Sequence, residues 1–375
     1  MKEKEPERIL FVTEEFPPHV GGAGTVAYQN AVVLSQWCSV DVLTRQRSEE
    51  SNRGEPFRSL EVWSNPKLWV ISLGYALWSM DLSEYDGIIL NDVGAAFVAG
   101  AVMNRESLSK SVVYTHGSDI YQVLNSPSLF YRLCRVPSYY RRALNHCYRV
   151  IAVSRQQAER VRHVSGVAGL IKKTRVIYAG IDRSIFERKP VKDSDSSEIQ
   201  LLSVGRVETS KGFPRKYEIF RSLVASGLDV HWTVVGAGGY LDDLTQSIRR
   251  DGLEDRVSCV GAVPRSELPS FYSEADIFWL LSDRESFGLV YLEANACGCP
   301  VMARRGSGVE EAVQDGVTGF LVDDFEECRE LIENCEHERL DPSDLIRHAD
   351  QFALRRMAKK LLSLLRSIDS DSQTW

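Results

Sequence analysis

Short runs of apolar, often β-branched residues recur along the chain and alternate with segments of helical length. They lie at residues 9–12, 39–44, 87–90, 111–116, 149–154 and 175–180, and then at 199–205, 229–236, 256–261, 276–282, 300–305 and 319–322. Runs that are apolar throughout are typical of parallel strands covered by helices on both faces. The pattern predicts two doubly wound α/β domains in succession.

A polar stretch at residues 182–198, which contains Pro190 and the sequence DSDSS, interrupts this alternation. It has no clear periodicity and is typical of an interdomain linker. We therefore expect an N-terminal domain over residues 1–181 and a C-terminal domain over 182–350. Residues 351–375 predict an amphipathic helix, which either caps the second domain or crosses back to the first. Two such domains facing each other would bind ligands in a cleft at the carboxyl ends of their strands.

The composition is that of an ordinary globular protein. Hydrophobic residues make up 43% and charged residues 26% of the 375, which excludes collagen-like, low-complexity and wholly disordered classes. No apolar run reaches the length of a membrane-spanning helix, and the charged start MKEKEPER lacks the pattern of a secretory signal. The eight cysteines are scattered without metal-ligand spacing, which indicates reduced thiols. We expect a cytoplasmic protein.

Two glycine-rich turns follow predicted strands, at residues 17–24 (PPHVGGAG) and 236–239 (GAGG). Glycine lets backbone N–H groups approach a phosphate at the start of a helix, although tight turns alone would also explain these residues. The dinucleotide fingerprint fails in the second turn, because Leu241 stands where its third glycine is required. A nicotinamide-dependent enzyme is therefore disfavoured.

Charged residues gather in two further segments of the second half. Arg206 and Lys211 follow its first strand, at a place where a guanidinium and an ammonium can neutralise a diphosphate. Glu285 and Glu293 lie eight residues apart in a segment in which we expect a helix to open. On one helix they would fall within about 80° of each other. Both would then line the predicted cleft.

Several segments, in order along the chain, resemble one enzyme family. They are PPHVGGAGTV, VVYTHGSD, VIAVS, VIYAGID, GRVETSKGF, VVGAGG, RVSCVGAVPRSELPSFYSEADIF, ESFGLVYLEANACGCPV and GVEEAVQDGVTGFLV. Together they resemble the retaining, nucleotide-sugar-dependent glycosyltransferases of family 4, densely in the second half and at a few points in the first. The resemblance implies the α/β fold called GT-B, with two Rossmann-like domains. The N-terminal domain would then face the acceptor and the C-terminal domain would bind the donor.

The resemblance also implies roles for single residues. Glu285 and Glu293 correspond to the two acids of the EX7E motif, the first near the donor sugar and the second on the ribose hydroxyls. Arg206 and Lys211 correspond to the diphosphate clamp, and His116 to a histidine near the anomeric centre. Backbone amides would contact the donor at Gly22, Phe287, Gly288 and Leu289. The implied catalytic set is Glu285, His116, Arg206 and Lys211.

The reaction implied is transfer of a sugar from a nucleotide-diphosphate donor, a UDP- or GDP-sugar, to an alcohol acceptor with retention. Fixed cations and amides stabilise a leaving diphosphate. Apart from Asp323-Asp324, no acidic pair stands beside a strand end. We therefore expect neither a metal nor a cofactor. The alternatives are another GT-B enzyme, such as a sugar-nucleotide epimerase or a transferase acting on a small sugar phosphate, and a catalytically silent nucleotide-sugar binder.

One block of the first half is strongly basic. Residues 101–181 carry thirteen Lys or Arg against three Asp or Glu, and no acid occurs from 120 to 158. Arginines alternate there with aromatic residues, which is typical of an interfacial surface. The pattern favours an anionic acceptor, either a lipid-linked glycan at the inner membrane face or a phosphorylated small molecule, near Arg132, Arg135, Arg141 and Arg142. A solvated helix with inward-packed tyrosines explains it equally. The net charge of -7 on the whole chain disfavours nucleic acid as a binding partner.

Overall fold

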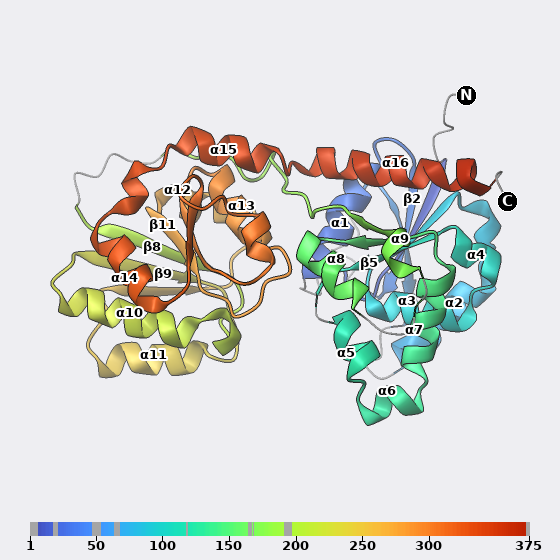
Figure 1. Ribbon diagram of the computed structural model, residues 1–375, viewed down its shortest axis with the longest axis horizontal. Helices are drawn as coiled ribbons and strands as arrows, with labels where there is room; N and C mark the ends of the chain where they lie inside the picture. Colours follow the sequence, from blue (N-terminus) through green and yellow to red (C-terminus); the bar gives the residue numbers. More distant parts are fainter. Residues whose placement is uncertain are drawn as a thin grey trace. The chain divides into compact units, whose positions relative to one another are not determined.

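The computed structural model describes residues 7–17, 22–46, 54–63, 68–117, 119–163, 167, 169–190 and 197–372. The chain divides into two compact units (Figure 1). Unit 1 contains Met1–Gly180 together with Leu354–Trp375, and unit 2 contains Ile181–Ala353. Among the described residues, no helix is both long enough and apolar enough to cross a bilayer.

Unit 1 is built on a seven-stranded parallel sheet. Its strands are β1 (Arg8–Val12), β2 (Ser39–Arg45), β3 (Arg58–Val62), β4 (Gly87–Leu90), β5 (Ser111–Thr115), β6 (Arg149–Ala152) and β7 (Thr174–Val176). They pair in the order β3-β2-β1-β4-β5-β6-β7. The six strands predicted for this half are confirmed, but β3 was missed. Its sequence RSLEV is mostly exposed or half-buried, because an edge strand needs no continuous apolar run.

Helices cover both faces of this sheet. They are α1 (Gly22–Leu34), α2 (Trp69–Ser79), the short 3₁₀ turn η2 (Leu82–Glu84), α3 (Val93–Val102), α4 (Arg105–Ser109), α5 (Asp119–Asn125), α6 (Leu129–Leu133), α7 (Val136–His146), α8 (Arg155–Arg162), α9 (Leu170–Lys173) and α16 (Leu354–Ser372). Helices α2, α3 and α7 pack side by side, and α1 packs against α16.

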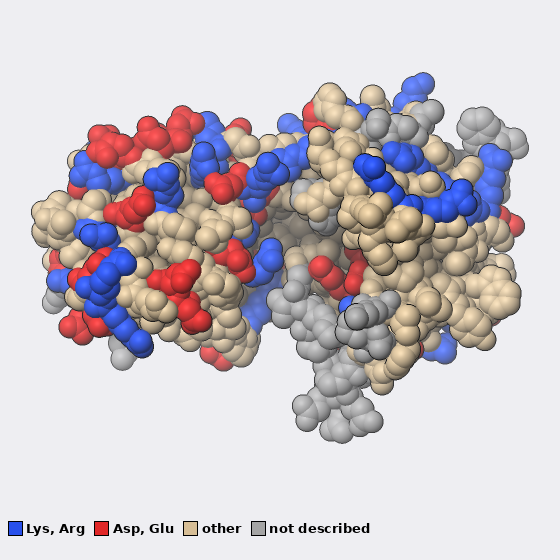
Figure 2. All heavy atoms as spheres, turned by 90° about the horizontal axis from the view of Figure 1, so that it is seen from below, with Lys and Arg blue, Asp and Glu red and all other residues tan. Residues whose placement is uncertain are grey.

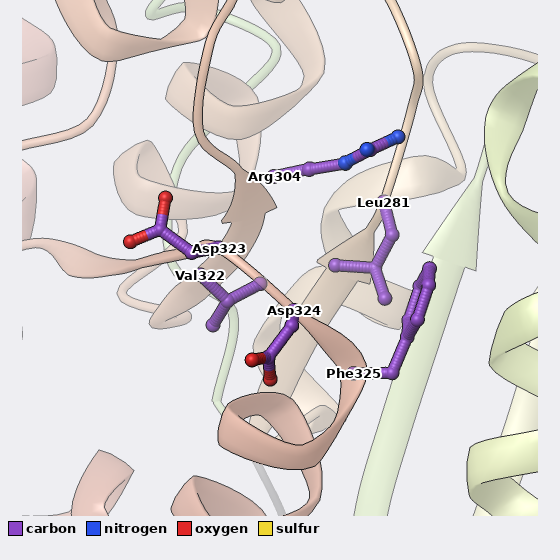
Figure 3. A pocket seen from close by; sticks show the side chains of 6 residues that line it. All are labelled: Leu281, Arg304, Val322, Asp323, Asp324 and Phe325. Atoms are coloured by element: carbon purple, nitrogen blue, oxygen red, sulfur yellow. The ribbon is translucent and has the colours of Figure 1, made fainter.

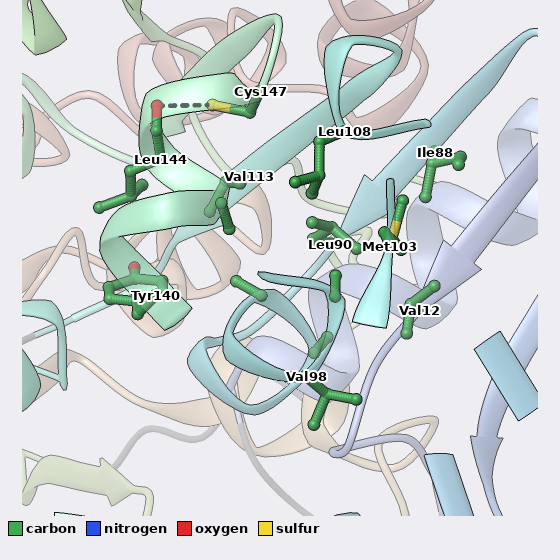
Figure 4. Close-up of a cluster of buried hydrophobic side chains, with 14 of the residues drawn as sticks. Val12, Ile88, Leu90, Val98, Met103, Leu108, Val113, Tyr140, Leu144 and Cys147 are labelled. Atoms are coloured by element: carbon green, nitrogen blue, oxygen red, sulfur yellow. Dashed lines mark hydrogen bonds between the residues drawn. The ribbon is translucent and has the colours of Figure 1, made fainter. Parts of the chain in front are cut away.

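The core of unit 1 lies between the sheet and the layer of α3 and α7. Figure 4 shows strand residues such as Val12, Leu90 and Val113 beside Val98 and Tyr140 of the two helices. The helices approach closely at Gly100, where a Cβ atom would stand 2.0 Å from the carbonyl oxygen of Tyr139. Glycine is therefore required at this crossing.

Unit 2 repeats the architecture with six parallel strands. They are β8 (Ile199–Val204), β9 (Val230–Val235), β10 (Val257–Gly261), β11 (Ile277–Leu280), β12 (Val301–Arg304) and β13 (Gly319–Val322). Their order is β10-β9-β8-β11-β12-β13, and all six predicted strands are confirmed. The helical elements are η3 (Thr209–Lys211), α10 (Phe213–Ala225), α11 (Leu241–Arg250), α12 (Leu268–Glu274), α13 (Leu289–Ala296), η4 (Gly308–Glu311), α14 (Phe325–Glu333), η5 (Glu336–Arg339) and α15 (Pro342–Asp350).

The last helix, α16, belongs to unit 1, although the residues that precede it belong to unit 2. The Tyr148 hydroxyl contacts the carbonyl and the hydroxyl oxygen of Ser367 at 3.0 and 2.9 Å. The space above Gly87 is filled by Leu365. The start of the predicted linker, in contrast, belongs to unit 2, because Phe186 is fully buried there against Tyr272. Most of the DSDSS run lies outside the described residues.

Candidate functional site

Three loops pack against one another at the carboxyl edge of the unit 2 sheet, and glycines lie at the contacts. Gly212 has a φ of 75°, and a Cβ atom there would stand 2.3 Å from the carbonyl oxygen of Leu281. The amide of Gly308 donates to the carbonyl oxygen of Glu285 at 2.9 Å, and a Cβ on this glycine would overlap Ser286. The loops that follow β8, β11 and β12 are therefore held in contact.

This contact brings Lys211 and Glu285 together. The Lys211 ammonium lies 2.6 Å from Oε1 of Glu285, and the two side chains are only 20% and 13% exposed. Arg206 is exposed, and no ion pair joins it to another described residue. The edge thus combines one neutralised cation with one available cation, and an incoming anion can recruit both.

Helix α13 begins later than the sequence predicts. Its first residue is Leu289, and Gly288 caps it with a φ of 89°, where a Cβ atom would stand 2.5 Å from the Tyr291 ring. Glu285 lies in the loop before the helix, so the argument that placed Glu285 and Glu293 on one helix was wrong. The leading N–H groups of a helix have no intrahelical acceptor. The amides of Gly288 and Leu289 stand at this position.

Glu293 lies on α13 and is 5% exposed. Its Oε1 accepts a hydrogen bond of 2.5 Å from Nη2 of Arg265, and the Arg265 guanidinium also lies 4.9 Å from the centre of the Phe186 ring. A buried carboxylate needs such a partner, because an unpaired charge is costly away from water. Sequence reasoning missed Arg265. The only signal was its place in the resembling segment RVSCVGAVPRSEL.

The second glycine-rich turn packs on the loop that carries Arg206. A Cβ atom on Gly236 would stand 1.9 Å from the Gly205 carbonyl oxygen, and one on Gly238 would stand 2.4 Å from that of Val207. Close packing of these loops therefore accounts for both glycines. The first turn differs, because Gly22 opens α1 and, beyond its chain neighbours and its own helix, no atom of the described residues lies within 4 Å of an added Cβ. Residues 18–21 of this turn lie outside the described residues.

The acidic pair Asp323-Asp324 has a structural role. Asp324 caps α14 by accepting from the amide of Glu327 at 2.9 Å, and the amide of Asp323 donates to the Glu327 carboxylate at 2.8 Å. Asp324 and Glu327 thus satisfy two backbone amides at the start of α14. Figure 3 shows the two carboxylates at a small pocket between β12 and α14. Within the described ranges, no three His, Cys, Asp or Glu residues are grouped so as to hold a metal ion.

In unit 1, His116 follows β5 and lies flat against Tyr114, with ring centres 5.4 Å apart. Its Nε2 lies 3.1 Å from Oδ1 of Asn91, whose Nδ2 donates to the carbonyl of Ala23 and to the hydroxyl of Thr13. Because Oδ1 only accepts, Nε2 carries the proton. Burial lowers the pKa of His116 to about 4. The imidazole is therefore neutral and keeps Nδ1 as an acceptor.

Two carboxyl groups that the sequence did not single out lie beside this histidine network. Asp92 caps α3 and also accepts from the Glu14 amide at 2.6 Å and the Thr13 hydroxyl at 2.8 Å. Burial, together with the charge of Asp92, raises the pKa of Glu14 to about 7. Arg45 lies 3.5 Å from the Glu14 carboxylate. The carboxyl edge of the unit 1 sheet thus holds a carboxyl that titrates near neutral pH.

The four arginines of the basic block divide into two pairs. Arg141 donates to the carbonyl oxygen of Leu124 at 3.1 Å, and Arg142 donates to those of Gly100 and Met103. These two guanidinium groups therefore tie α7 to α5 and α3. Arg132 and Arg135 are exposed at the end of α6. Only the second pair is available to an anionic partner.

Comparison with known proteins identifies the family. A model described as Glycosyltransferase Family 4 matches residues 20–185, and one described as Glycosyl transferases group 1 matches residues 184–352. Together they cover most of the chain. The chain belongs to family 4 of the glycosyltransferases, and its two Rossmann-like units have the GT-B fold.

Individual relatives are more distant. The GDP-mannose-dependent alpha-(1-6)-phosphatidylinositol monomannoside mannosyltransferase of Mycolicibacterium smegmatis is 26% identical over 84% of this chain and 85% of its own length. The amylovoran biosynthesis glycosyltransferase AmsK of Erwinia amylovora is 33% identical over 40% of this chain and 38% of its own. Among solved structures, Anabaena Alr3699/HepE in complex with UDP and glucose has a TM-score of 0.77 at 22% identity, over 96% and 99% of the two chains.

Proposed function

We propose that this protein transfers a sugar from a UDP- or GDP-sugar to a hydroxyl group of a sugar-containing or lipid-linked acceptor, in glycan, glycolipid or glycoconjugate biosynthesis. The observation that carries the proposal is the pair of Lys211 and Glu285, held 2.6 Å apart next to the start of α13. Unit 2 would bind the donor and unit 1 the acceptor. One relative is named as GDP-mannose-dependent and one structural neighbour is a complex with UDP, which supports either base.

The proposed chemistry follows from where charge develops. The leaving nucleoside diphosphate gains negative charge as the sugar becomes oxocarbenium-like, so groups that bind the diphosphate stabilise the transition state more than the ground state. Lys211 and Arg206 would supply cations, and the amides of Phe287, Gly288 and Leu289 would supply dipoles at the helix start. Once the diphosphate engages Lys211, Glu285 is left beside the developing positive sugar.

The remaining roles follow the same proposal. Glu293, oriented by Arg265, would accept hydrogen bonds from the ribose hydroxyls. Gly22 is the first residue of α1, and its backbone would approach the donor from unit 1. His116 would act as a neutral acceptor through Nδ1 for a hydroxyl near the anomeric centre. We propose retention of configuration by front-face attack, in which the departing phosphate takes the acceptor proton, and we propose that no metal is needed.

The experiment that tests the function is a thermal-shift panel of nucleotides and nucleotide sugars on the full chain. A nucleotide that binds only the folded protein stabilises it by RT ln(1 + [L]/Kd), so the true donor raises the melting temperature. No shift with any nucleotide contradicts the proposal.

Product analysis with and without acceptor then separates the alternatives. An epimerase converts the nucleotide sugar without acceptor, and a silent binder shifts in melting temperature but forms no product. Turnover that persists in EDTA supports the metal-independent step, and turnover abolished by EDTA and restored by a divalent cation contradicts it. The anomeric configuration of the product, read by NMR, tests retention.

A further inference from the structure

Helix α6 is an apolar element with no buried residue. Four of its five residues are Leu129, Phe130, Tyr131 and Leu133, and all four are exposed. Phe130 is 67% exposed and Leu133 is 74% exposed. Large apolar side chains gathered on one exposed element indicate an interaction surface.

Contacts with the neighbouring helices hold α6 in place. Figure 1 shows α6 at the end of a projection that α5 and α7 form with it. Ser128 caps the helix by accepting from the amide of Tyr131, and the next helix is anchored by the buried residues Val136 and Pro137. Arg141 ties α7 back to the end of α5. We call Leu129–Leu133 with Cys134 and Arg135 the α6 tip.

The charged residues of the α6 tip are all basic. Arg132 and Arg135 are exposed within it, and no acidic residue occurs between residues 120 and 158. On the face drawn in Figure 2, red and blue side chains are mixed over unit 2, whereas unit 1 shows a broad tan area with few acidic side chains. Aromatic and aliphatic side chains beside arginines, without acids, match an anionic lipid surface.

We propose that the α6 tip is the element by which this protein binds the surface of an anionic bilayer, with Phe130 and Leu133 entering the acyl boundary and Arg132 and Arg135 contacting the head groups. A second copy of the chain is the weaker occupant, because a stable interface needs roughly 800 Å² from each partner and a single short helix cannot supply it. The inference extends the proposed function by naming the site of a lipid-linked acceptor, but it does not depend on the transfer chemistry.

The first test is flotation of the full chain, without nucleotide sugar, on vesicles of phosphatidylcholine with or without about one-third phosphatidylglycerol. We expect the wild type to bind the anionic vesicles and to dissociate as salt rises. The double variant Phe130→Ser with Leu133→Ser should bind at least about tenfold more weakly, because each side chain loses its burial in the acyl boundary. Its fold should be kept, since neither side chain is buried.

The second variant is Arg132→Gln with Arg135→Asn. Its binding to anionic vesicles should be roughly tenfold to thirtyfold weaker, and its binding to neutral vesicles should not change. Asparagine is chosen because Arg135 has a left-handed φ of 54°. The matched control, Arg215→Gln with Arg249→Gln, removes two exposed arginines of unit 2 and should bind like the wild type. The proposal is overturned if both tip variants bind anionic vesicles as tightly as the wild type, or if the wild type does not bind them. It is also overturned if a tip variant abolishes self-association of the protein instead of vesicle binding.

Two exposed cysteines allow an independent test of which surface contacts the membrane. Cys134 lies in the tip and Cys259 lies on β10 of unit 2. Each is labelled singly with an environment-sensitive dye, after the other accessible cysteines, which include Cys38 and Cys335, are replaced by serine. A blue shift on anionic vesicles at Cys134 alone supports the proposal, and a shift only at Cys259 overturns it. If the protein binds vesicles but transfers no sugar, the proposed function is contradicted. If it transfers sugar but does not bind vesicles, the membrane-binding role of the α6 tip is contradicted.

Discussion

The carboxyl edges of the two sheets share one architecture but hold different chemistry. In unit 2 the polar side chains form ion pairs, Lys211 with Glu285 and Arg265 with Glu293. In unit 1 the corresponding edge holds the neutral His116 and the Glu14 carboxyl whose pKa is raised. One edge therefore offers fixed charges, and the other offers hydrogen bonds and groups that hold or release a proton.

The difference fits the two substrates that the proposed function assigns to the two units. A diphosphate is anionic and is best met by preorganised cations. Under the proposed function, Lys211 and Arg206 of unit 2 would be those cations. A sugar hydroxyl is neutral and is best met by hydrogen-bond acceptors. Under the proposed function, Nδ1 of His116 in unit 1 would be such an acceptor. The chemistry is set by the loops that follow the strands, because strands of both sheets are filled with apolar side chains.

The largest expected effect is on the cation of unit 2. Lys211→Met should lower kcat by about 100-fold or more, because it removes a preorganised charge from the leaving diphosphate. The measurement is steady-state turnover with the donor that the thermal-shift panel selects. A matched control is Lys216→Met, since Lys216 is fully buried on α10 and bonds to Ser203 of the core. Wild-type turnover in the Lys211 variant would show that unit 2 does not act through this charge.

The next effect concerns the second ion pair. Glu293→Gln should weaken nucleotide binding by about 1.5 to 3 kcal/mol, because it removes a charge-assisted acceptor from the ribose. Isothermal titration with UDP and GDP measures the loss. Arg265→Met should weaken binding through the same carboxylate, so the double variant should lose less than the sum of the two. Strictly additive losses would contradict the orienting role of Arg265.

A third prediction concerns the core of unit 2, where Lys216 is fully buried against the Phe213 ring and bonds to Ser203 at 2.8 Å. Burial holds its pKa well below 10.5, so the unfolded chain binds this proton more readily. Wild-type stability should therefore rise with pH until the ordinary lysine pKa is passed. Lys216→Met should remove that slope and stabilise unit 2 by about 2 kcal/mol at neutral pH.

Hydrogen exchange at β8, followed across pH, localises this effect to unit 2. Ser203 keeps its other partners in the variant, because it also donates to the Trp279 carbonyl and accepts from the Trp232 indole. A less stable variant at neutral pH would mean that the lysine is charged and held by its aromatic neighbours.

The smallest effect is on unit 1. The pKa of Glu14 is about 7 in the folded protein and near 4.5 when unfolded, so wild-type stability should fall as pH rises between these values. Glu14→Gln should match the wild type below this window and exceed it by about 1 kcal/mol above it, after allowance for partial exposure of the carboxyl. Denaturant unfolding at several pH values measures the difference. A difference that is the same at every pH would contradict the titration.

The sequence was sufficient for most of the fold. Twelve strands followed from apolar runs, because parallel strands buried on both faces leave a continuous signal. It was insufficient for β3, whose position at the sheet edge removes that signal. It also misplaced the start of α13. The turn at Gly288 packs on the Tyr291 ring, and the loop before it packs on Gly308, which no local pattern records.

For the site, the sequence alone identified Lys211, Glu285 and Glu293 as charged residues near strand ends. Only the tertiary structure decided their partners. Arg265 and Glu293 are 28 residues apart, and Glu14 meets Asp92 across 78 residues, because the strands of a parallel sheet bring distant loops to one edge. Tertiary packing likewise separated Arg141, which binds a carbonyl, from Arg132, which stays exposed. A charge is visible in the sequence, but its role depends on burial and neighbours, and these exist only in the folded chain.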